Sequence, residues 1–342
     1  MHFSLDTYFA LWHMLCSNKM APPIVCRDWQ SLTHTGEYTP MQAEPILQHH
    51  SSVYSIVTEQ IIRQLEAGVA PWRRPWRCEP PCNLISGKPY RGINPFLLSP
   101  QGFGSRYWLT FNQAIKIGGH VRKGEKSSMV TFWNIGPEKI TTSPEGITRK
   151  SKPILLRYYN VFNLEQTKNI ADKLGIGSAT PRVPDIAQCE RIIANMPNRP
   201  HMDQSSRACY RPATDTVSMP SRAAFESSEA FYSTLFHELT HSTGHASRIG
   251  RDGIEHIENF GSESYSKEEL IAELGASMLS GVTGISPATI DNSASYLQSW
   301  IKVLKGDAKL IVQAASGAQK ASDYILGATA KSEEISIEGG AL

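Results

Sequence analysis

The spacing of apolar residues predicts a helix near the start of the patterned part of the chain. From Val53 to Ala67 the apolar positions recur every three or four residues, and the helix is expected to end at Gly68. Thr110 is a suitable N-cap for a shorter helix that ends at Gly118. Farther along, helical spacing predicts five more helices, over residues 185–196, 227–245, 266–282, 288–305 and 307–326.

Strand-like segments lie mainly in the first half of the chain. Two runs rich in β-branched and aromatic residues, 128–135 and 154–162, predict strands joined by a long hairpin loop. A short strand pair is expected within 208–220. Because strands gather early and helices follow, we predict an α+β fold in which a small α+β domain precedes a mainly helical domain.

The length of 342 residues favours two domains, since one domain takes about 100–200 residues. We expect the first domain over 51–165, a linker rich in Gly, Ser, Thr and Pro within 166–184, and the second domain over 185–330. Residues 1–50 show no sustained period and are expected to form a poorly ordered extension, and 331–342 a polar tail.

The composition is that of an ordinary globular protein. With 40% hydrophobic and 19% charged residues, collagen-like, coiled-coil and wholly disordered classes are excluded. No apolar run approaches the roughly 20 residues of a transmembrane helix, and the segment Tyr8 to Cys16 lacks the basic start and cleavage site of a signal peptide. Six cysteines without a regular framework are typical of a reducing compartment. We predict a cytoplasmic protein with no membrane partner.

The charge is divided unevenly along the chain. Residues 51–165 hold 16 lysines and arginines against seven glutamates, a net charge of +9, whereas the whole chain carries only +2. The remaining residues therefore carry −7. A basic half beside an acidic half indicates that the first half meets a polyanion.

A metal-binding pattern lies in the predicted helix over 227–245. His237, Glu238 and His241 form HExxH, in which both histidines share one helix face and can hold one metal ion. Glu238 is then placed to take a proton from water on the metal. The alternative is a surface helix with two solvated histidines. The apolar neighbours Leu235 and Leu239 argue against it, because unpaired polar groups are costly to bury.

The third ligand is expected from the segment KEELIAELGASML. Glu269 and Glu273 lie four residues apart on one helix face, as in the gluzincin peptidases, which this segment resembles. That resemblance implies that Glu269 binds the metal and Glu273 orients a histidine ligand, although exchanged roles stay open. A metzincin would need a third histidine at position 247, which is Ser247. We expect Zn²⁺, with another divalent ion such as Mn²⁺ as the alternative.

Tryptophans and basic residues alternate in the +9 half, most densely in PWRRPWR at 71–77. Unpaired nucleic acid is bound by such surfaces, since cations follow the phosphates and bases stack on aromatic rings. The alternative, that the tryptophans fill a core, is the better expectation for any one of them. We expect at least one of Trp72, Trp76, Tyr90 and Trp108 to be a core residue.

Several motifs together resemble the ArdC antirestriction family. They are PWRRPW (71–76), YRGIN (90–94), WLTFNQA (108–114), GGHVRKGEKS (118–127), TFW (131–133), YYNVFN (158–163), HELTHSTGHASR (237–248) and YSKEELIAELGA (265–276). The resemblance implies an N-terminal single-stranded DNA-binding domain, a zincin-like metallopeptidase domain and a bacterial protein that protects incoming plasmid DNA from restriction during conjugation. The predicted DNA-contacting residues are Trp72, Arg73, Arg74, Trp76, Tyr90, Arg91, Asn94, Trp108, Lys123 and Lys126.

Three hypotheses follow. The first is a DNA-binding metallopeptidase that acts on a host protein or peptide. The second is a protein that coats single-stranded DNA and whose metal domain is structural or inactive. The third is a peptidase whose basic half binds an acidic protein. Glu238 favours the first over the second, because a structural site needs no general base, and the interleaved aromatic residues favour DNA over an acidic protein.

Overall fold

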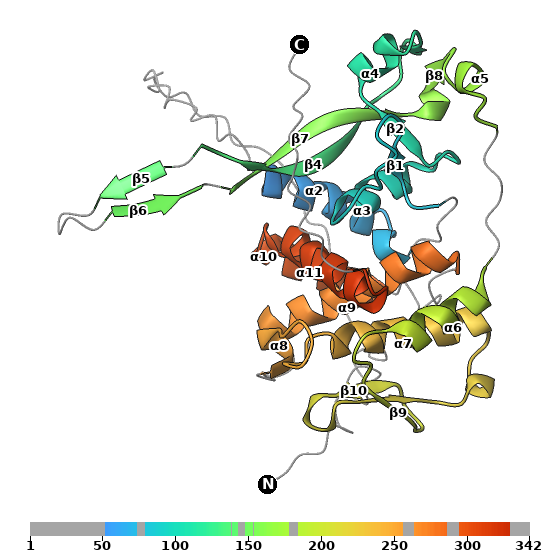
Figure 1. Ribbon diagram of the computed structural model, residues 1–342, viewed down its shortest axis with the longest axis vertical. Coiled ribbons are helices and arrows are strands. Elements are labelled where there is room, and N and C mark those ends of the chain that lie inside the picture. Colours follow the sequence, from blue (N-terminus) through green and yellow to red (C-terminus); the bar gives the residue numbers. More distant parts are fainter. Residues whose placement is uncertain are drawn as a thin grey trace, which may run out of the picture. The chain divides into compact units, whose positions relative to one another are not determined.

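The structure is a computed structural model of the chain. It describes residues 52–73, 79–137, 139–142, 148–152, 154–177, 184–255, 263–285 and 294–328. These residues belong to one compact unit that begins at Ser52. The fold class is α+β, as predicted, with a mixed first part and a mainly helical second part (Figure 1). The predicted extension, 1–50, and the predicted tail, 331–342, lie outside the described residues.

The first part combines short helices with a mixed sheet of strand order β1-β2-β7-β4. In this sheet β1 and β2 are parallel, and the other neighbours are antiparallel. Its elements are α2 (Val53–Glu66), β1 (Cys82–Asn83), α3 (Asn94–Leu98), β2 (Tyr107–Leu109), α4 (Phe111–Lys116), β3 (His120–Val121), β4 (Ser128–Ile135), β5 (Lys139–Thr142), β6 (Thr148–Ser151), β7 (Ile154–Asn163), β8 (Thr167–Lys168) and α5 (Ala171–Leu174).

Capping residues set the starts of both helices predicted in this part. The Ser52 Oγ accepts a hydrogen bond from the backbone N–H of Ser55 at 3.2 Å, so α2 begins at the next residue. At the start of α4, Thr110 and Gln113 form a reciprocal capping box, with hydrogen bonds of 2.9 and 3.2 Å. Gly118 follows α4 with a φ of 77°, a conformation that favours glycine. Both predicted helices are confirmed.

The predicted long hairpin consists of β4 and β7. Its register runs from Ser128 opposite Val161 to Ile135 opposite Ile154. The segment between these strands, expected to be a loop, contains a second antiparallel ribbon of β5 and β6, drawn projecting from the hairpin in Figure 1. The connection between β4 and β7 is therefore partly strand and not wholly the loop that the sequence pattern had indicated.

The second part is mainly helical and carries a three-stranded sheet of order β10-β11-β9. The predicted strand pair is confirmed as antiparallel β10 and β11, whereas β9, which joins β11 in parallel, was not anticipated. The elements are α6 (Ile186–Asn195), β9 (His201–Gln204), β10 (Cys209–Arg211), β11 (Thr216–Met219), α7 (Ser228–Ser242), α8 (Asp252–Glu255), α9 (Glu263–Thr283), α10 (Ala294–Gly306) and α11 (Leu310–Ile325).

One hydrophobic core is shared by the two parts of the chain. Leu65 of α2 and Trp72 belong to the same buried cluster as Leu274 of α9, Trp300 of α10 and Ile311 of α11. Helix α9 packs between α7 and α11 (Figure 1). Helices of the second part therefore complete the core that α2 begins.

The predicted linker is partly structured. Within 166–184, β8 pairs with β3, and Ile170 is buried in a cluster with Leu109 and Ala114. Residues 178–183 lie outside the described part. None of the described helices has the length and apolarity needed to cross a membrane.

Candidate functional site

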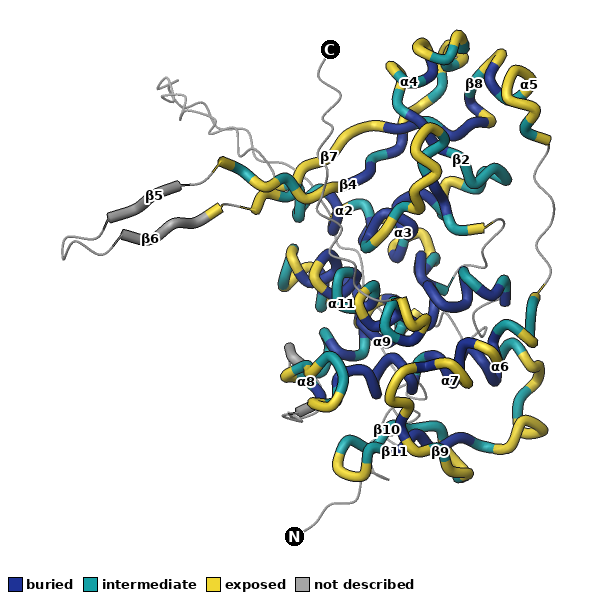
Figure 2. The backbone as a smooth tube through the Cα atoms, in the orientation of Figure 1, coloured by how far each residue is buried: buried dark blue, intermediate teal, exposed yellow. Residues whose placement is uncertain are grey.

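Helix α7 carries the HExxH residues through the interior of the second part. The Ser227 Oγ caps its start by accepting from the backbone N–H of Ala230 at 3.1 Å. Leu235, Phe236 and Leu239 are at most 3% exposed and lie in a core shared with β11 and α9. The alternative of a solvated surface helix is therefore excluded, since the helix is mostly buried (Figure 2).

The packing of α7 on α9 brings three potential metal ligands together. The Nε2 atoms of His237 and His241 are 3.1 Å apart, and each lies 3.7 Å from a carboxylate oxygen of Glu269. Tetrahedral ligands at about 2.0–2.2 Å from a zinc ion are roughly 3.5 Å from one another. Within the described residues, this trio forms a group that could hold a metal ion, and its spacing fits one divalent ion.

The close approach of the two helices depends on Gly275. A Cβ atom at this position would lie 2.6 Å from Cγ2 of Thr240, which is closer than side chains pack. Ala272 and Ala276 are also buried on α9. Small residues on this face of α9 therefore allow the close packing of α9 on α7.

Glu268 contacts the His241 ring at Nδ1, the nitrogen that does not face His237. Its carboxylate lies 3.3 Å from Nδ1 of His241 and accepts from Nε of Arg251 at 2.9 Å. Arg251 also donates to the Thr243 hydroxyl at 2.6 Å and to the Thr240 carbonyl at 2.9 Å. Burial opposes ionisation of Glu268, but Arg251 holds its pKa below the usual value. A carboxylate in this position fixes the ring and tautomer of a ligand histidine.

Replacement of Glu268 by Gln is expected to weaken metal binding about 10- to 100-fold, because the neutral amide holds His241 less firmly and leaves Arg251 without its counter-charge. Competition with a chelating dye measures the affinity. Glu226→Gln is the matched control, since it removes an exposed carboxylate that lies just before α7. Equal affinity in Glu268→Gln and wild type would show that Glu268 does not support the metal centre.

The protonation behaviour of the site follows from burial and from nearby carboxylates. Burial lowers the pKa of His237 to about 3, so its imidazole is neutral. Burial acts to lower the pKa of His241, but the hydrogen bond to Glu268 and the nearby carboxylates of Glu269, Glu268 and Glu238 together outweigh it, and the pKa rises to about 9. Burial raises the pKa of Glu238 to about 7. A carboxyl group with such a pKa suits proton transfer near neutral pH.

Glu273 lies one turn beyond Glu269 but is bound to another group. Its carboxylate forms a 2.6 Å ion pair with Arg73, whose side chain is 5% exposed. The Arg73 guanidinium lies 3.6 Å from the centre of the Tyr296 ring, and the Tyr296 hydroxyl donates to Glu273 at 3.2 Å. The Trp72 indole N–H donates to the same hydroxyl at 3.0 Å. Of the two glutamates considered as ligands, Glu269 is the one whose carboxylate lies close to both histidines.

Three further residues of the centre were not predicted from the sequence. Glu268 was missed although it adjoins Glu269, because only the four-residue spacing of Glu269 and Glu273 was considered. Burial raises the pKa of the Tyr265 phenol, and the charge of Glu269 and a side-chain hydrogen bond to it add to the rise. Arg251 reaches Glu268 from a segment whose sequence carries no signal for this role.

Comparisons with known proteins match both parts of the chain. A family model of the N-terminal domain of the anti-restriction factor ArdC matches residues 51–162, and one of a zincin-like metallopeptidase matches 187–317. The metal-free crystal structure of the antirestriction protein ArdC from plasmid R388 is 36% identical, with a TM-score of 0.63 over 80% of this chain and 96% of that one. The chain belongs to the ArdC family of antirestriction proteins.

Other relatives differ in length. The Mn(II)-bound crystal structure of R388 ArdC is 35% identical to the present chain, with a TM-score of 0.63. The match covers 81% of the present chain and 98% of the R388 chain. Protein y4eC of Sinorhizobium fredii (strain NBRC 101917 / NGR234) is 31% identical to this chain. The match covers 85% of this chain and 97% of y4eC. Two DNA primases TraC of Escherichia coli are each 36% identical to this chain, over 80% and 79% of its length. The chain spans only 20% and 26% of the lengths of these two primases.

Several residues predicted to contact DNA are structural in this ArdC-family protein. Trp72 and Trp108 are 1% and 2% exposed and lie in hydrophobic cores, and Arg73 is paired with Glu273. The Asn94 amide donates to the Thr131 carbonyl at 2.8 Å and accepts from the Thr131 backbone N–H at 2.7 Å. The prediction that these four residues contact DNA is therefore wrong. Their side chains are buried and bound within the protein, so DNA cannot reach them.

The other predicted DNA contacts have different environments. Tyr90 is partly buried against the core that contains Trp108. Arg91 is half exposed and forms an ion pair with Asp323 of α11. Lys123 and Lys126 are exposed, as a phosphate-binding surface requires. Arg74 and Trp76 lie outside the described residues.

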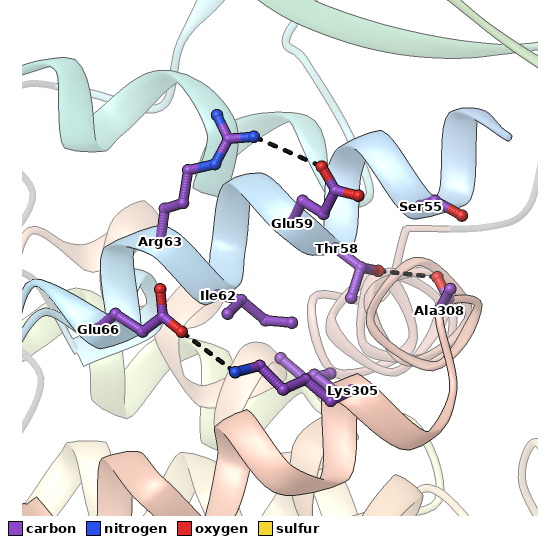
Figure 3. Close-up of a pocket in the computed structure, with 9 residues that line it drawn as sticks. Ser55, Thr58, Glu59, Ile62, Arg63, Glu66, Lys305 and Ala308 are labelled. Atoms are coloured by element: carbon purple, nitrogen blue, oxygen red, sulfur yellow. Dashed lines mark hydrogen bonds and ion pairs between the residues drawn. The ribbon is translucent and has the colours of Figure 1, made fainter. Parts of the chain in front are cut away.

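A shallow groove runs between α2 and the end of α10 (Figure 3). An ion pair of 3.4 Å joins Arg63 to Glu59, and one of 3.3 Å joins Lys305 to Glu66. These side chains are all at least half exposed, and such pairs contribute little to stability. The groove is lined by none of the three metal-site residues. We assign it no chemistry.

Proposed function

We propose that this ArdC-family protein binds single-stranded DNA and uses a divalent metal centre, occupied by Zn²⁺, to hydrolyse a peptide bond in a host protein, and thereby protects incoming plasmid DNA during conjugation. The observation that carries the proposal is the trio of His237, His241 and Glu269 with Glu238 beside it. A purely structural site has no need of a fourth, proton-accepting group. The R388 relative was solved with Mn(II), so another divalent ion is the alternative occupant.

The proposed chemistry assigns each residue one task. His237, His241 and Glu269 would hold the ion, which when bound polarises a carbonyl group and activates water. Glu238 accepts the proton of the attacking water and returns it to the leaving amine. Glu268 keeps the His241 ring in place through its contact with Nδ1.

The surroundings of Glu238 favour an extended peptide as substrate. Strand β10 ends its sheet in the order β10-β11-β9, so one of its edges is unpaired by the described strands. The backbone N–H of Tyr210, in β10, lies beside the Glu238 carboxylate. An extended peptide can add to such an edge through main-chain hydrogen bonds, which would bring its carbonyl groups to the metal centre.

The DNA part of the proposal is tested by binding measurements on the purified full chain. We expect an oligo-dT strand to bind much more tightly than a duplex of the same length, with little dependence on base sequence. Affinity should fall steeply with salt, with a slope of about −0.7 per phosphate contact in a plot of log affinity against log salt concentration. A flat salt response or equal affinity for the duplex would contradict single-strand binding.

A further inference from the structure

Strands β4 and β7 expose aromatic side chains along the outer part of their hairpin. Where the hairpin joins the sheet, Val130 and Val161 are fully buried in a core with Trp108. Farther out, Phe132 is 37% and Tyr159 is 36% exposed. Figure 2 shows largely exposed backbone over this part of β7. Large aromatic side chains exposed together on a strand pair are a feature of binding surfaces.

The strand register places three of these side chains on one face. Phe132 is opposite Arg157, and Val130 is opposite Tyr159. Opposite residues of an antiparallel pair share a face, and so do residues two apart on one strand. Phe132, Arg157 and Tyr159 therefore lie together, and we call them the aromatic strip. The ring centres of Phe132 and Tyr159 are 5.6 Å apart.

Tyr90 supports the strip from the sheet. Its hydroxyl lies beside that of Tyr159, and its ring packs against the core that contains Trp108. A ring that lies against an ordered neighbour loses less conformational freedom when a ligand stacks on it. The buried Trp108 and the partly buried Tyr90 therefore pack beneath the exposed aromatic residues and are not themselves the exposed surface.

The charge around the strip matches an anionic ligand. Arg157 is exposed and makes no ion pair within the described part of the chain. Lys152, also exposed, precedes β7 by two residues. Residues 51–165 carry a net charge of +9. An exposed arginine on the same face as two aromatic rings can meet a phosphate while adjacent bases stack on the rings.

We propose that the aromatic strip is the stacking platform for a single DNA strand, with bases on Phe132 and Tyr159 and a phosphate on Arg157. This inference rests on the single-strand binding proposed above and adds the location. It assigns to the hairpin the task that the sequence pattern had assigned to Trp72 and Trp108.

Binding of fluorescein-labelled oligo-dT of roughly 20 nucleotides to the full chain tests the proposal. Phe132→Ala and Tyr159→Ala should each weaken binding about 5- to 150-fold, the range expected when one base loses its stacking partner. Tyr158→Ala is the matched control. Tyr158 is 48% exposed on the same strand, but it alternates to the opposite face of the hairpin. This control should bind within roughly twofold of the wild type.

Two further variants separate stacking from folding and from general charge. Phe132→Leu keeps an apolar side chain but removes the ring, so a loss of affinity at an unchanged unfolding temperature supports stacking. Arg157→Gln should reduce the salt slope by about 0.7, the value for one phosphate contact with a single strand.

The outcomes distinguish the location from the function. If the wild type does not bind the strand, the DNA-binding function itself fails. If the wild type binds and the Phe132 and Tyr159 variants bind equally well, the function stands and the location is overturned. An equal loss in Tyr158→Ala also overturns the assignment to this face. If the strip variants change only the oligomeric state of the protein, the strip contacts a second copy of the chain and the proposal is wrong.

Discussion

Replacement of His237 and His241 by alanine is expected to reduce bound metal from about one ion per chain to none, because only Glu269 of the three ligands remains. Metal analysis after dialysis measures the content. Added Zn²⁺ or Mn²⁺ should raise the unfolding temperature of the wild type and leave that of the double variant unchanged. The expected stabilisation is about 2.7 kcal/mol at a metal concentration one hundred times the dissociation constant.

His245→Ala is the control for this experiment. His245 lies in the same motif, but its Nδ1 is 2.8 Å from the Ser247 hydroxyl and it is not one of the clustered ligands. The variant should keep its metal. Stoichiometric metal in the double variant would overturn the ligand assignment.

Glu238→Gln separates metal binding from chemistry. The variant should retain its metal and cleave peptides about 10²- to 10⁴-fold more slowly, since the general base is lost. Transfer of an unmodified plasmid into a restricting host then shows whether cleavage matters. If Glu238→Gln protects the plasmid as well as the wild type does, hydrolysis is not required, and the hypothesis that the protein coats DNA replaces the peptidase hypothesis.

Replacement of Arg73 by Met is expected to lower the free energy of unfolding by about 3–5 kcal/mol. The substitution removes the guanidinium that lies against the Tyr296 ring and pairs with Glu273. The Glu273 carboxylate, whose side chain is only 18% exposed, is then left without a counter-charge. Urea unfolding followed by tryptophan fluorescence measures the change. The effect should be large because this pair joins residues 200 positions apart, beside the core shared by both parts of the chain.

Arg63→Met is the matched control for charge. It removes the same charge from an ion pair in α2 whose side chains are 75% and 57% exposed, so the expected loss is only about 0–1 kcal/mol. The double variant Arg73→Met, Glu273→Gln should recover part of the loss, because no unpaired charge remains buried. If Arg73→Met unfolds at the wild-type urea concentration, the pair does not stabilise the joint between the two parts.

Local sequence determined much of the secondary structure. Apolar residues at three- and four-residue spacing mark α2 and α9, and capping residues such as Ser52 and Thr110 define helix starts, because a cap acts within one turn. The long hairpin and the short pair β10 and β11 were predicted from β-rich runs. Strand β9 and the ribbon of β5 and β6 were not, since short polar strands lack a clear alternating pattern.

The sequence by itself also predicted a metal-binding pattern, because HExxH places two imidazoles on one face of a helix whatever surrounds it. Only the tertiary structure decided the rest. Whether Glu269 or Glu273 faces the histidines depends on how α9 rotates against α7, and Glu268 and Arg251 reach His241 from other elements. Likewise, Trp72 and Phe132 are both aromatic residues in a basic segment, yet one is buried and the other exposed. Burial depends on contacts with distant residues such as Trp300, and composition does not specify them.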